Sequence, residues 1–249
     1  MCNGIALKGQ TALITGAANR LGRAIAIALA DQGVNVVIHH RESVEEAKET
    51  AGRVAQTGAN AWTLRADLST PEGAETLVPR AIELAGSIDI LINNASVFAL
   101  SQLMTFTVEE FLDNVRINAL APTLIARRFV QETQQGAIVN MLDCRITDYD
   151  AEHAAYHASK RMLFTLTRMM ALEFAPNFQV NAIAPGLILP PEGKDESYLE
   201  QLASSNPLNR YGDAGEVTRA VLFLLQSRFI TGQVIFLDGG RHMRGSVYG

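Results

Sequence analysis

The sequence predicts an α/β fold in which a doubly wound, parallel sheet of about seven strands carries helices on both faces. Short apolar runs, often β-branched, recur along the chain, and longer stretches with helical spacing lie between them. The runs are apolar at nearly every position, which is typical of parallel strands covered on both faces. No linker-like tract, low-complexity segment or repeat interrupts the alternation, so we expect a single domain over residues 1–249.

The elements follow in order along the chain. Strands are expected in the runs that begin at Thr11, Val34, Asn60, Ile88, Gly136, Phe178 and Gly232. Helices are expected over 21–30, 44–56, 111–130, 156–174 and 214–225. The least regular stretch, 185–207, has a proline pair and a charged middle, which predict a loop and a short helix over a cleft. In such a sheet a ligand binds beyond the carboxyl ends of the strands, where the strand order reverses.

Composition narrows the class of protein. The net charge of −5 gives no general attraction to nucleic acid or to an anionic membrane. The two cysteines, Cys2 and Cys144, make no disulfide framework and no cysteine-rich metal cluster. The first nine residues are too short for a signal peptide, and no apolar run approaches the roughly 18 residues of a membrane span. We expect a soluble, cytoplasmic protein without nucleic-acid or membrane partners.

The stretch TGAANRLG, from Thr15, predicts a turn that binds phosphate. Gly16 and Gly22 bracket the connection from the first strand to the first helix, and such glycines let a backbone approach a ligand closely. The N-terminus of the helix then presents free N–H groups to a diphosphate. Arg20 stands where a third glycine is expected. A glycine-containing turn without a ligand is the alternative.

The end of the second strand favours NADPH over NADH. An acidic residue there would pair with a ribose 2′-hydroxyl, whereas His39, His40 and Arg41 offer donors and positive charge to a 2′-phosphate. The alternative is that these are solvated residues at the end of a strand.

Polar residues also follow the third and fourth strands. Asp67 and Asn93 are expected to bond the adenine or to hold neighbouring strand ends, and Ala95 lets the cofactor come close. We therefore count all three as cofactor contacts.

The motif YHASK carries the chemistry. Tyr156 and Lys160 are four residues apart on one face of a predicted helix, so the ammonium can approach the phenol from beneath. Hydride transfer leaves negative charge on the atom next to the acceptor carbon, and that atom needs a proton. A nearby cation and the charge of the cofactor are expected to lower the pKa of the phenol toward neutrality. The spacing alone is common on helices without any function.

Six motifs together resemble the short-chain dehydrogenase/reductases. TGAANRLG, NNAS, IVNM, YHASK, NAIAPG and LDGG stand in that family's order and spacing over essentially the whole chain. The resemblance implies a Rossmann-type fold, a nicotinamide cofactor, and a catalytic Tyr156 and Lys160 assisted by Asn118. It also implies a cofactor half of about residues 1–140, a catalytic and substrate half of about 141–249, and a homotetramer. Lys160 would hold the ribose of the cofactor, and Tyr156 would contact both cofactor and substrate. Further expected contacts are Leu21, Leu68, Pro185, Gly186 and Ile188 with the cofactor and Leu187 with the substrate.

The chain departs from the family where a serine commonly follows IVN. The sequence NMLDCR places Asp143 there instead. Asp143 together with Arg20 resembles the pteridine reductase branch, in which NNASVF also matches a segment that holds the pterin through Ser96 and Phe98. The ending LDGGRHMR is similar to that of dihydromonapterin reductases.

These residues together predict an NADPH-dependent pterin reductase. Phe98 would stack on the ring opposite the nicotinamide, Arg20 would bond both the diphosphate and the pterin, and Asp143 would pass protons to Tyr156 or to the pterin. One alternative is a generic carbonyl or 3-oxoacyl reductase, and another is an NADP(H)-binding regulatory protein with a vestigial site. His153 and His157 are four residues apart, but no third ligand stands at a suitable spacing, so we expect no metal.

Overall fold

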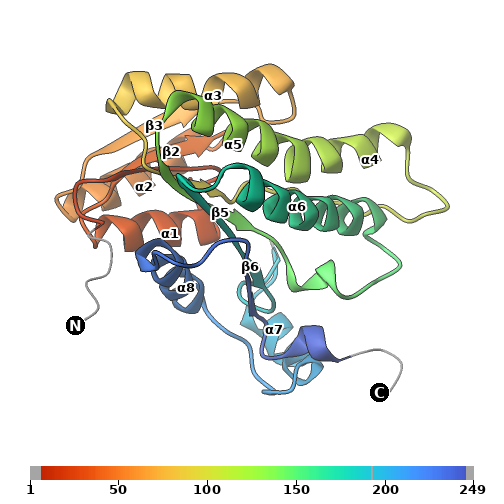
Figure 1. The fold of residues 1–249 in the computed structure, drawn as a ribbon. Helices are drawn as coiled ribbons and strands as arrows, with labels where there is room; N and C mark the ends of the chain where they lie inside the picture. Colours follow the sequence, from red (N-terminus) through yellow and green to blue (C-terminus); the bar gives the residue numbers. More distant parts are fainter. Residues whose placement is uncertain (1–6, 192, 245–249) are drawn as a thin grey trace.

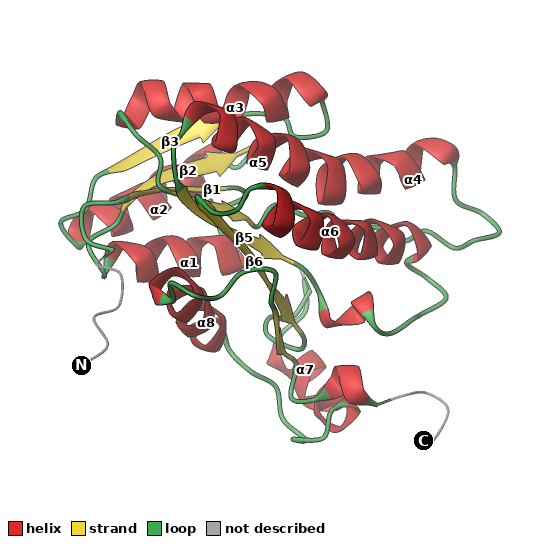
Figure 2. Ribbon diagram, viewed as in Figure 1, coloured by secondary structure: helices red, strands yellow, loops and turns green. Residues whose placement is uncertain are grey.

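The computed structural model describes residues 7–191 and 193–244, in which seven parallel strands form one sheet in the order β3-β2-β1-β4-β5-β6-β7 (Figures 1 and 2). The prediction of a seven-stranded, doubly wound α/β domain is confirmed. The strands are β1 Thr11–Ile14, β2 Asn35–His40, β3 Ala61–Arg65, β4 Ile90–Asn93, β5 Gly136–Met141, β6 Phe178–Pro185 and β7 Val234–Leu237.

Helices cover both faces of the sheet (Figure 1). One face packs against α1 (Arg20–Ala30), α2 (Val44–Gln56) and α8 (Ala214–Gln226). The other packs against α3 (Pro71–Ala85), α5 (Ala121–Glu132) and α6 (Ala154–Glu173). Helix α4 (Val108–Val115) precedes α5, and α7 (Glu196–Leu202) lies in the irregular segment after β6.

Two helices differ from the sequence expectation. The helix expected over 111–130 is α4 and α5 joined by a π-helical turn, Arg116–Leu120. It begins earlier because Thr107 and Glu110 form a capping box. Helix α3, absent from the helices that we named, begins where Thr70 accepts a hydrogen bond from the N–H of Gly73 and Pro71 follows.

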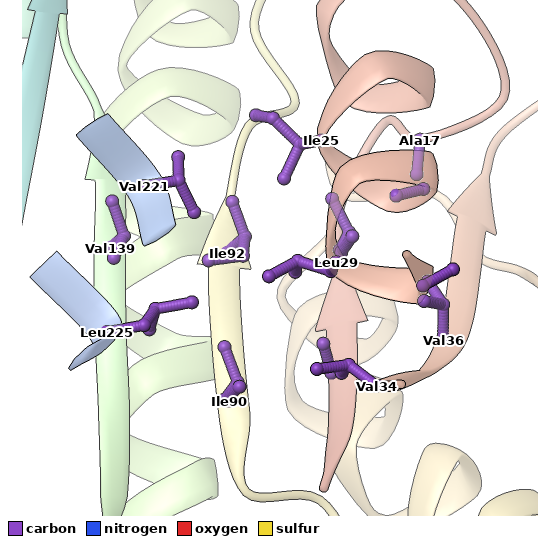
Figure 3. Packing of buried hydrophobic residues seen from close by; sticks show 14 of the residues in the cluster. Ala17, Ile25, Leu29, Val34, Val36, Ile90, Ile92, Val139, Val221 and Leu225 are labelled. Atoms are coloured by element: carbon purple, nitrogen blue, oxygen red, sulfur yellow. The ribbon is translucent and has the colours of Figure 1, made fainter. Parts of the chain in front are cut away.

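The strands are buried on both faces, as their uninterrupted apolar character predicts. Leu13 and Leu91 point into the core under α3 and α5, whereas Ile14 and Ile92 point into the core under α1 and α8. Figure 3 shows the second of these cores, where side chains of α1 and α8 meet the strands. Each fully buried side chain of this size contributes about 1.5–3 kcal/mol.

The strand order reverses between β1 and β4, and there the strand ends are held together. The hydroxyl of Thr15 accepts hydrogen bonds from the N–H groups of Asn94, at 2.9 Å, and Ala95, at 3.0 Å. The Asn94 amide donates to the carbonyl oxygens of Thr15 and Gly16. The two segments that follow these strands therefore form one rigid edge for a ligand.

Among the described residues, no helix combines the length and the apolar character that crossing a membrane requires. Cys144 is buried and free, and burial raises the pKa of its thiol to about 12, so it packs as a small side chain. Cys2 lies outside the described residues.

Candidate active site

A cavity of about 370 Å³ opens at the carboxyl ends of β1 to β4, next to the reversal of strand order. The turn after β1, the ends of β2 and β3, and the segment after β4 make its walls. The expected site residues that line it are Gly16, Arg20, Leu21, Gly22, His39, Arg41, Asp67, Leu68, Ala95 and Ser96.

The two glycines of the phosphate turn are required by close backbone packing. Gly16 has a φ of +62°, and a Cβ there would lie 3.0 Å from the Cα of Ala95. A Cβ at Gly22 would lie 2.3 Å from the carbonyl oxygen of Gly16, a distance that no side chain tolerates. The turn can therefore bring the start of α1 to the cavity only with glycine at these positions.

The start of α1 is suited to an anion. Asn19 precedes the helix, and its side chain makes no capping hydrogen bond within the described part of the chain. Asn19, Arg20, Leu21 and Gly22 all line the cavity, so the positive end of the helix dipole faces it. This arrangement fits a diphosphate.

Arg20 keeps the backbone conformation of the glycine that it replaces. Its φ is +50°, and among the described residues only Arg20 and Asn209 have a positive φ without being glycine. Its guanidinium donates a hydrogen bond of 2.5 Å to the carbonyl oxygen of Pro190. Arg20 thus joins the phosphate turn to the irregular segment after β6.

The two histidines at the end of β2 correct the expected 2′-phosphate site. The N–H of Gly16 donates to Nδ1 of His39 at 3.1 Å, so Nε2 carries the hydrogen and donates to the carbonyl oxygen of Ala66 at 3.2 Å. Burial lowers the pKa of His39 to about 4, which leaves the ring neutral. His39 therefore holds the phosphate turn and supplies no positive charge.

His40 is also buried, and burial together with Arg65 lowers its pKa. Its side chain lies outside the lining of the cavity, because the alternation of β2 turns it away. Arg41 is exposed, lines the cavity, and lies 3.6 Å from Glu42. Of the three expected donors, Arg41 remains as the cation for a 2′-phosphate.

The polar residues after β3 and β4 are divided by their orientation. Asp67 lines the cavity, and hydrogen bonds from Ser69 hold the pKa of its carboxyl below the ordinary value. Asn93 points instead into the sheet, where its amide donates to Asn140 at 2.8 Å. The neighbouring Asn94 takes its place at the cavity. The sequence could not decide between the two asparagines, because the exact end of β4 decides which one turns outward.

Tyr156 and Asp143 form the centre of the catalytic group. The phenol of Tyr156 donates a hydrogen bond of 2.8 Å to Oδ2 of Asp143, and the N–H of Arg145 donates to Oδ1 at 2.8 Å. Burial, the negative charge of Asp143 and this hydrogen bond raise the pKa of Tyr156 well above its ordinary value. The expected lowering is therefore wrong for this arrangement, since the carboxylate stabilises the protonated phenol.

Lys160 lies beneath Tyr156, as the spacing predicts. Its ammonium is 5.8 Å from the centre of the phenol ring and donates to the carbonyl oxygen of Met141 at 2.8 Å. Burial lowers the pKa of Lys160 to about 8, against an opposing effect of Asp143. The ammonium has two further N–H groups for a ligand.

Asn118 connects the cavity to the catalytic helix. It sits in the π-helical turn, and its Oδ1 accepts from the N–H of Val97 at 2.8 Å and from Ser96 at 3.0 Å. Its amide donates to the carbonyl oxygen of Val97 at 2.9 Å and to Ser159 of α6 at 3.0 Å. The π-helical turn thus places the buried amide of Asn118 between Val97, in the segment after β4, and Ser159 of α6.

Phe98 stands beside Tyr156, with 49% of the residue exposed. The ring centres are 4.6 Å apart and the rings are nearly perpendicular. Ser96, expected with Phe98 at the substrate, lines the cavity and bonds Asn118. Phe98 therefore lies beside Tyr156, and Ser96 lies at the cavity beside Asn118.

The segment after β6 lies outside the lining of the first cavity. A Cβ at Gly186 would lie 2.8 Å from the Cα of Asp238, so this glycine serves backbone packing. Ile188 is buried in the core under α8, and Leu187 lines a separate cavity of about 800 Å³ beside the C-terminal residues. Pro185, Gly186, Leu187 and Ile188 do not line the first cavity, and neither do Asp143, Tyr156 and Lys160, so their expected contacts remain predictions.

The described residues contain no group of three or more His, Cys, Asp or Glu side chains that could hold a metal ion. His153 and His157 both lie at Asp150, but His157 is buried and its Nδ1 lies 3.2 Å from the carbonyl oxygen of Arg145. Asp150 therefore holds both histidines in place. The sequence did not predict this pairing, although Asp150 lies only a few residues before them.

Comparisons with known proteins identify the family of this chain. A family model described as Enoyl-(Acyl carrier protein) reductase matches residues 16–242. Versicolorin reductase 1 of Aspergillus parasiticus is 31% identical over 94% of this chain and 97% of its own. The 3-oxoacyl-[acyl-carrier-protein] reductase FabG of Staphylococcus aureus (strain Mu50) is 29% identical over 94% of this chain and 98% of its own.

A solved structure is similar over almost the full length. FolM, alternative dihydrofolate reductase 1 of Brucella canis, was crystallised in complex with NADP. It has 34% sequence identity and a TM-score of 0.90 over 98% of each chain. Because the family model spans most of this chain, the chain belongs to the short-chain dehydrogenase/reductase family of oxidoreductases.

Proposed function

We propose that this protein is an NADPH-dependent reductase of a pterin, acting on a dihydropterin or on an oxidised pterin. The observation that carries the proposal is the hydrogen bond between Tyr156 and Asp143, at the position where the family commonly has a serine. A carboxyl group there can hold and release a proton, which reduction at a ring C=N bond requires at nitrogen. Phe98 beside Tyr156 offers a flat apolar wall to the ring.

The cofactor is NADP(H). The residues of this chain fit it, because the cavity has an uncapped helix start at its base and the cation Arg41 on its wall. When bound, the nicotinamide supplies the hydride. Gly16 and Gly22 let the diphosphate approach, and Arg41 is placed for the 2′-phosphate.

Tyr156 is the proton donor to the substrate. Its raised pKa keeps the phenol protonated through neutral pH, so the proton is present when charge develops on the substrate. Lys160 lies beneath the ring, where its positive charge stabilises the phenolate that remains after transfer.

Asp143 holds and restores this proton. One carboxylate oxygen is fixed by the N–H of Arg145, and the other accepts from Tyr156, so the O–H points at Asp143 before the substrate binds and turns to the substrate for the transfer. Asp143 is half-buried, which leaves it open to a proton from solvent. Once the phenol has given up its proton, a protonated Asp143 can replace it.

The test is NADPH oxidation with dihydrobiopterin, dihydromonapterin, dihydrofolate and a panel of small ketones at equal concentrations. We expect the pterins to be turned over best. Asp143→Asn should lower kcat with the pterin by about 10- to 100-fold and leave the Kd for NADPH within about twofold, because Asn cannot hold a transferable proton. Equal kcat for Asp143→Asn and the wild type would contradict the role of Asp143.

A second candidate is a carbonyl or 3-oxoacyl reductase, which the relatives at about 30% identity favour. In that enzyme Asp143 would only accept the hydrogen bond that a serine commonly makes. Asp143→Ser separates the two functions: it should preserve turnover of a ketone but reduce turnover of a pterin. A wild type that turns over the ketone best, with that turnover preserved in Asp143→Ser, would favour the second candidate.

The expected homotetramer is supported by the edge of the sheet. The four apolar residues of β7 are each only half-buried, and Phe223 on the adjacent α8 is 53% exposed. Apolar surface of this kind is typical of an interface. Sedimentation velocity tests it, and a monomer at micromolar concentration would contradict it.

A further inference from the structure

Phe98 is held on one side although half of it is exposed. Its ring stacks on His153, with centres 4.1 Å apart and planes 13° from parallel. The edge contact with Tyr156 comes from a different direction, since those two rings are nearly perpendicular. The Arg145 guanidinium lies 5.2 Å from the ring centre as a third contact. An exposed aromatic side chain is ordinarily free to change rotamer, and of these three contacts the parallel stack on His153 has the shortest distance between centres and restrains the ring most.

His153 is itself fixed by Asp150. The ring Nδ1 of His153 lies 3.0 Å and 3.1 Å from the two carboxylate oxygens of Asp150. The backbone N–H of His153 donates to Oδ1 of the same carboxylate at 2.9 Å. The Arg145 guanidinium also bonds this carboxylate. Partial burial alone would raise the pKa of Asp150, but the hydrogen bonds from Glu152 and His153 hold it well below its usual range. Asp150 is therefore a carboxylate that orients the imidazole.

The loop that carries Phe98 is also tied to the start of the catalytic helix. The carbonyl oxygen of Ser101 accepts a hydrogen bond from the N–H of Ala154, and the Ser101 hydroxyl accepts one from the N–H of Ala155. The N–H of Ser101 donates to the carbonyl oxygen of Glu152. Since no side-chain cap from His153 is present within the described residues, Ser101 supplies it from a distant segment. Phe98, His153 and Tyr156 are thus parts of one rigid unit.

We propose that His153 is a positioning residue that fixes Phe98 as one wall of the substrate site and thereby favours flat, aromatic heterocycles. The inference rests on the proposed pterin reduction, whose substrate ring needs such a wall. Without the stack, Phe98 would have to be ordered each time a substrate binds. The conformational entropy lost in this ordering would weaken substrate binding.

Three substitutions separate the ring of His153 from its hydrogen bonds. His153→Ala removes both, His153→Gln keeps a polar group without a ring, and His153→Phe keeps a ring that can stack. We expect KM for dihydrobiopterin to rise about five- to tenfold in the Ala and Gln variants and to return to within about twofold in the Phe variant. The Kd for NADPH and kcat should stay near the wild-type values, and thermal melting checks folding.

A second measurement needs no substrate. The protein has ten phenylalanines, and with ¹³C-labelled phenylalanine the ring signals of Phe98 are assigned by their loss in Phe98→Leu. They should shift in His153→Ala and His153→Gln and stay close to the wild type in His153→Phe. Unchanged Phe98 signals and unchanged KM in the Ala variant, or no rescue by Phe, would overturn the proposal. If the wild type turns over no pterin while the Phe98 signals still depend on the ring at 153, the pterin function fails and the positioning role stands.

Discussion

The phosphate turn and the substrate wall are built in different ways. In the turn, Gly22 packs on the backbone of Gly16, and Gly16 packs on the backbone of Ala95 after β4. In the wall, Phe98 depends on His153, 55 positions later (153 − 98), and Arg20 reaches Pro190. The proposed cofactor site therefore rests on close backbone packing that excludes a Cβ, whereas the proposed substrate site rests on side-chain contacts between distant segments.

The largest effect is expected on the catalytic side. Tyr156→Phe removes the hydroxyl that bonds Asp143 and should lower kcat by about 10²- to 10⁴-fold, because the proton donor is lost. Fluorescence titration should show an unchanged Kd for NADPH, since Tyr156 is not among the residues that line the cavity at the phosphate turn. Tyr149→Phe, on an exposed tyrosine, is the matched control and should leave kcat unchanged. A Tyr156→Phe enzyme with wild-type kcat would remove this residue from proton transfer.

Gly22→Ala should damage the cofactor side instead. Its Cβ would lie 2.3 Å from the carbonyl oxygen of Gly16, so the turn must open and the Kd for NADPH should rise at least about tenfold. We expect the free energy of unfolding to fall by about 1–3 kcal/mol as well. Gly52→Ala, in α2 with open space at the Cβ, should raise that free energy by about 0.5–1 kcal/mol. NADPH affinity that survives Gly22→Ala would show that the turn is not the phosphate site.

Burial of the charged Lys160 ammonium lowers the stability of the fold. The pKa of its ammonium falls from 10.5 to about 8 on folding, so between these pH values the unfolded chain binds more protons than the native one. The free energy of unfolding therefore rises with pH between about pH 8 and pH 10.5. Below about pH 8 the buried charge of Lys160 destabilises the fold. Lys160→Met should abolish turnover yet raise the free energy of unfolding at pH 7 by about 1–3 kcal/mol.

This gain should disappear above about pH 10.5, where the lysine is neutral in both states. Denaturant unfolding at several pH values checks it, with Lys48→Met as the exposed control, which should change stability by less than about 0.5 kcal/mol. A Lys160→Met protein less stable than the wild type at pH 7 would contradict the sign.

Arg20→Gly is expected to have the smallest effect and tests the contact between the two regions. Glycine adopts the positive φ without strain, so NADPH binding should stay within about threefold, while KM for the pterin should rise about three- to tenfold because the bond to Pro190 and the substrate contact are lost. Asn209→Gly relieves the same kind of strain elsewhere and should leave KM unchanged. Equal pterin kinetics in the two variants would separate Arg20 from the substrate.

The fold could be predicted almost completely from the sequence, because buried parallel strands and amphipathic helices leave local patterns. The Tyr156–Lys160 pair followed from helical spacing. The neutrality of His39 could not be predicted, since it depends on the hydrogen bonds with Gly16 and Ala66 and on burial. The role of Asn94 could not be predicted, because it depends on the exact end of β4. The role of Gly186 depends on its packing against Asp238, a tertiary contact that a single sequence does not reveal.

The π-helical turn at Arg116–Leu120 holds one more residue than a regular helical turn would. Deleting a single residue there would let α4 and α5 run as one uninterrupted α-helix, a more regular secondary structure. The same deletion would rotate Asn118 by about 100° around the helix axis, away from Val97 and Ser159. Local helical regularity and the catalytic arrangement are therefore in conflict at this point, and the irregular turn is the form that a working site needs.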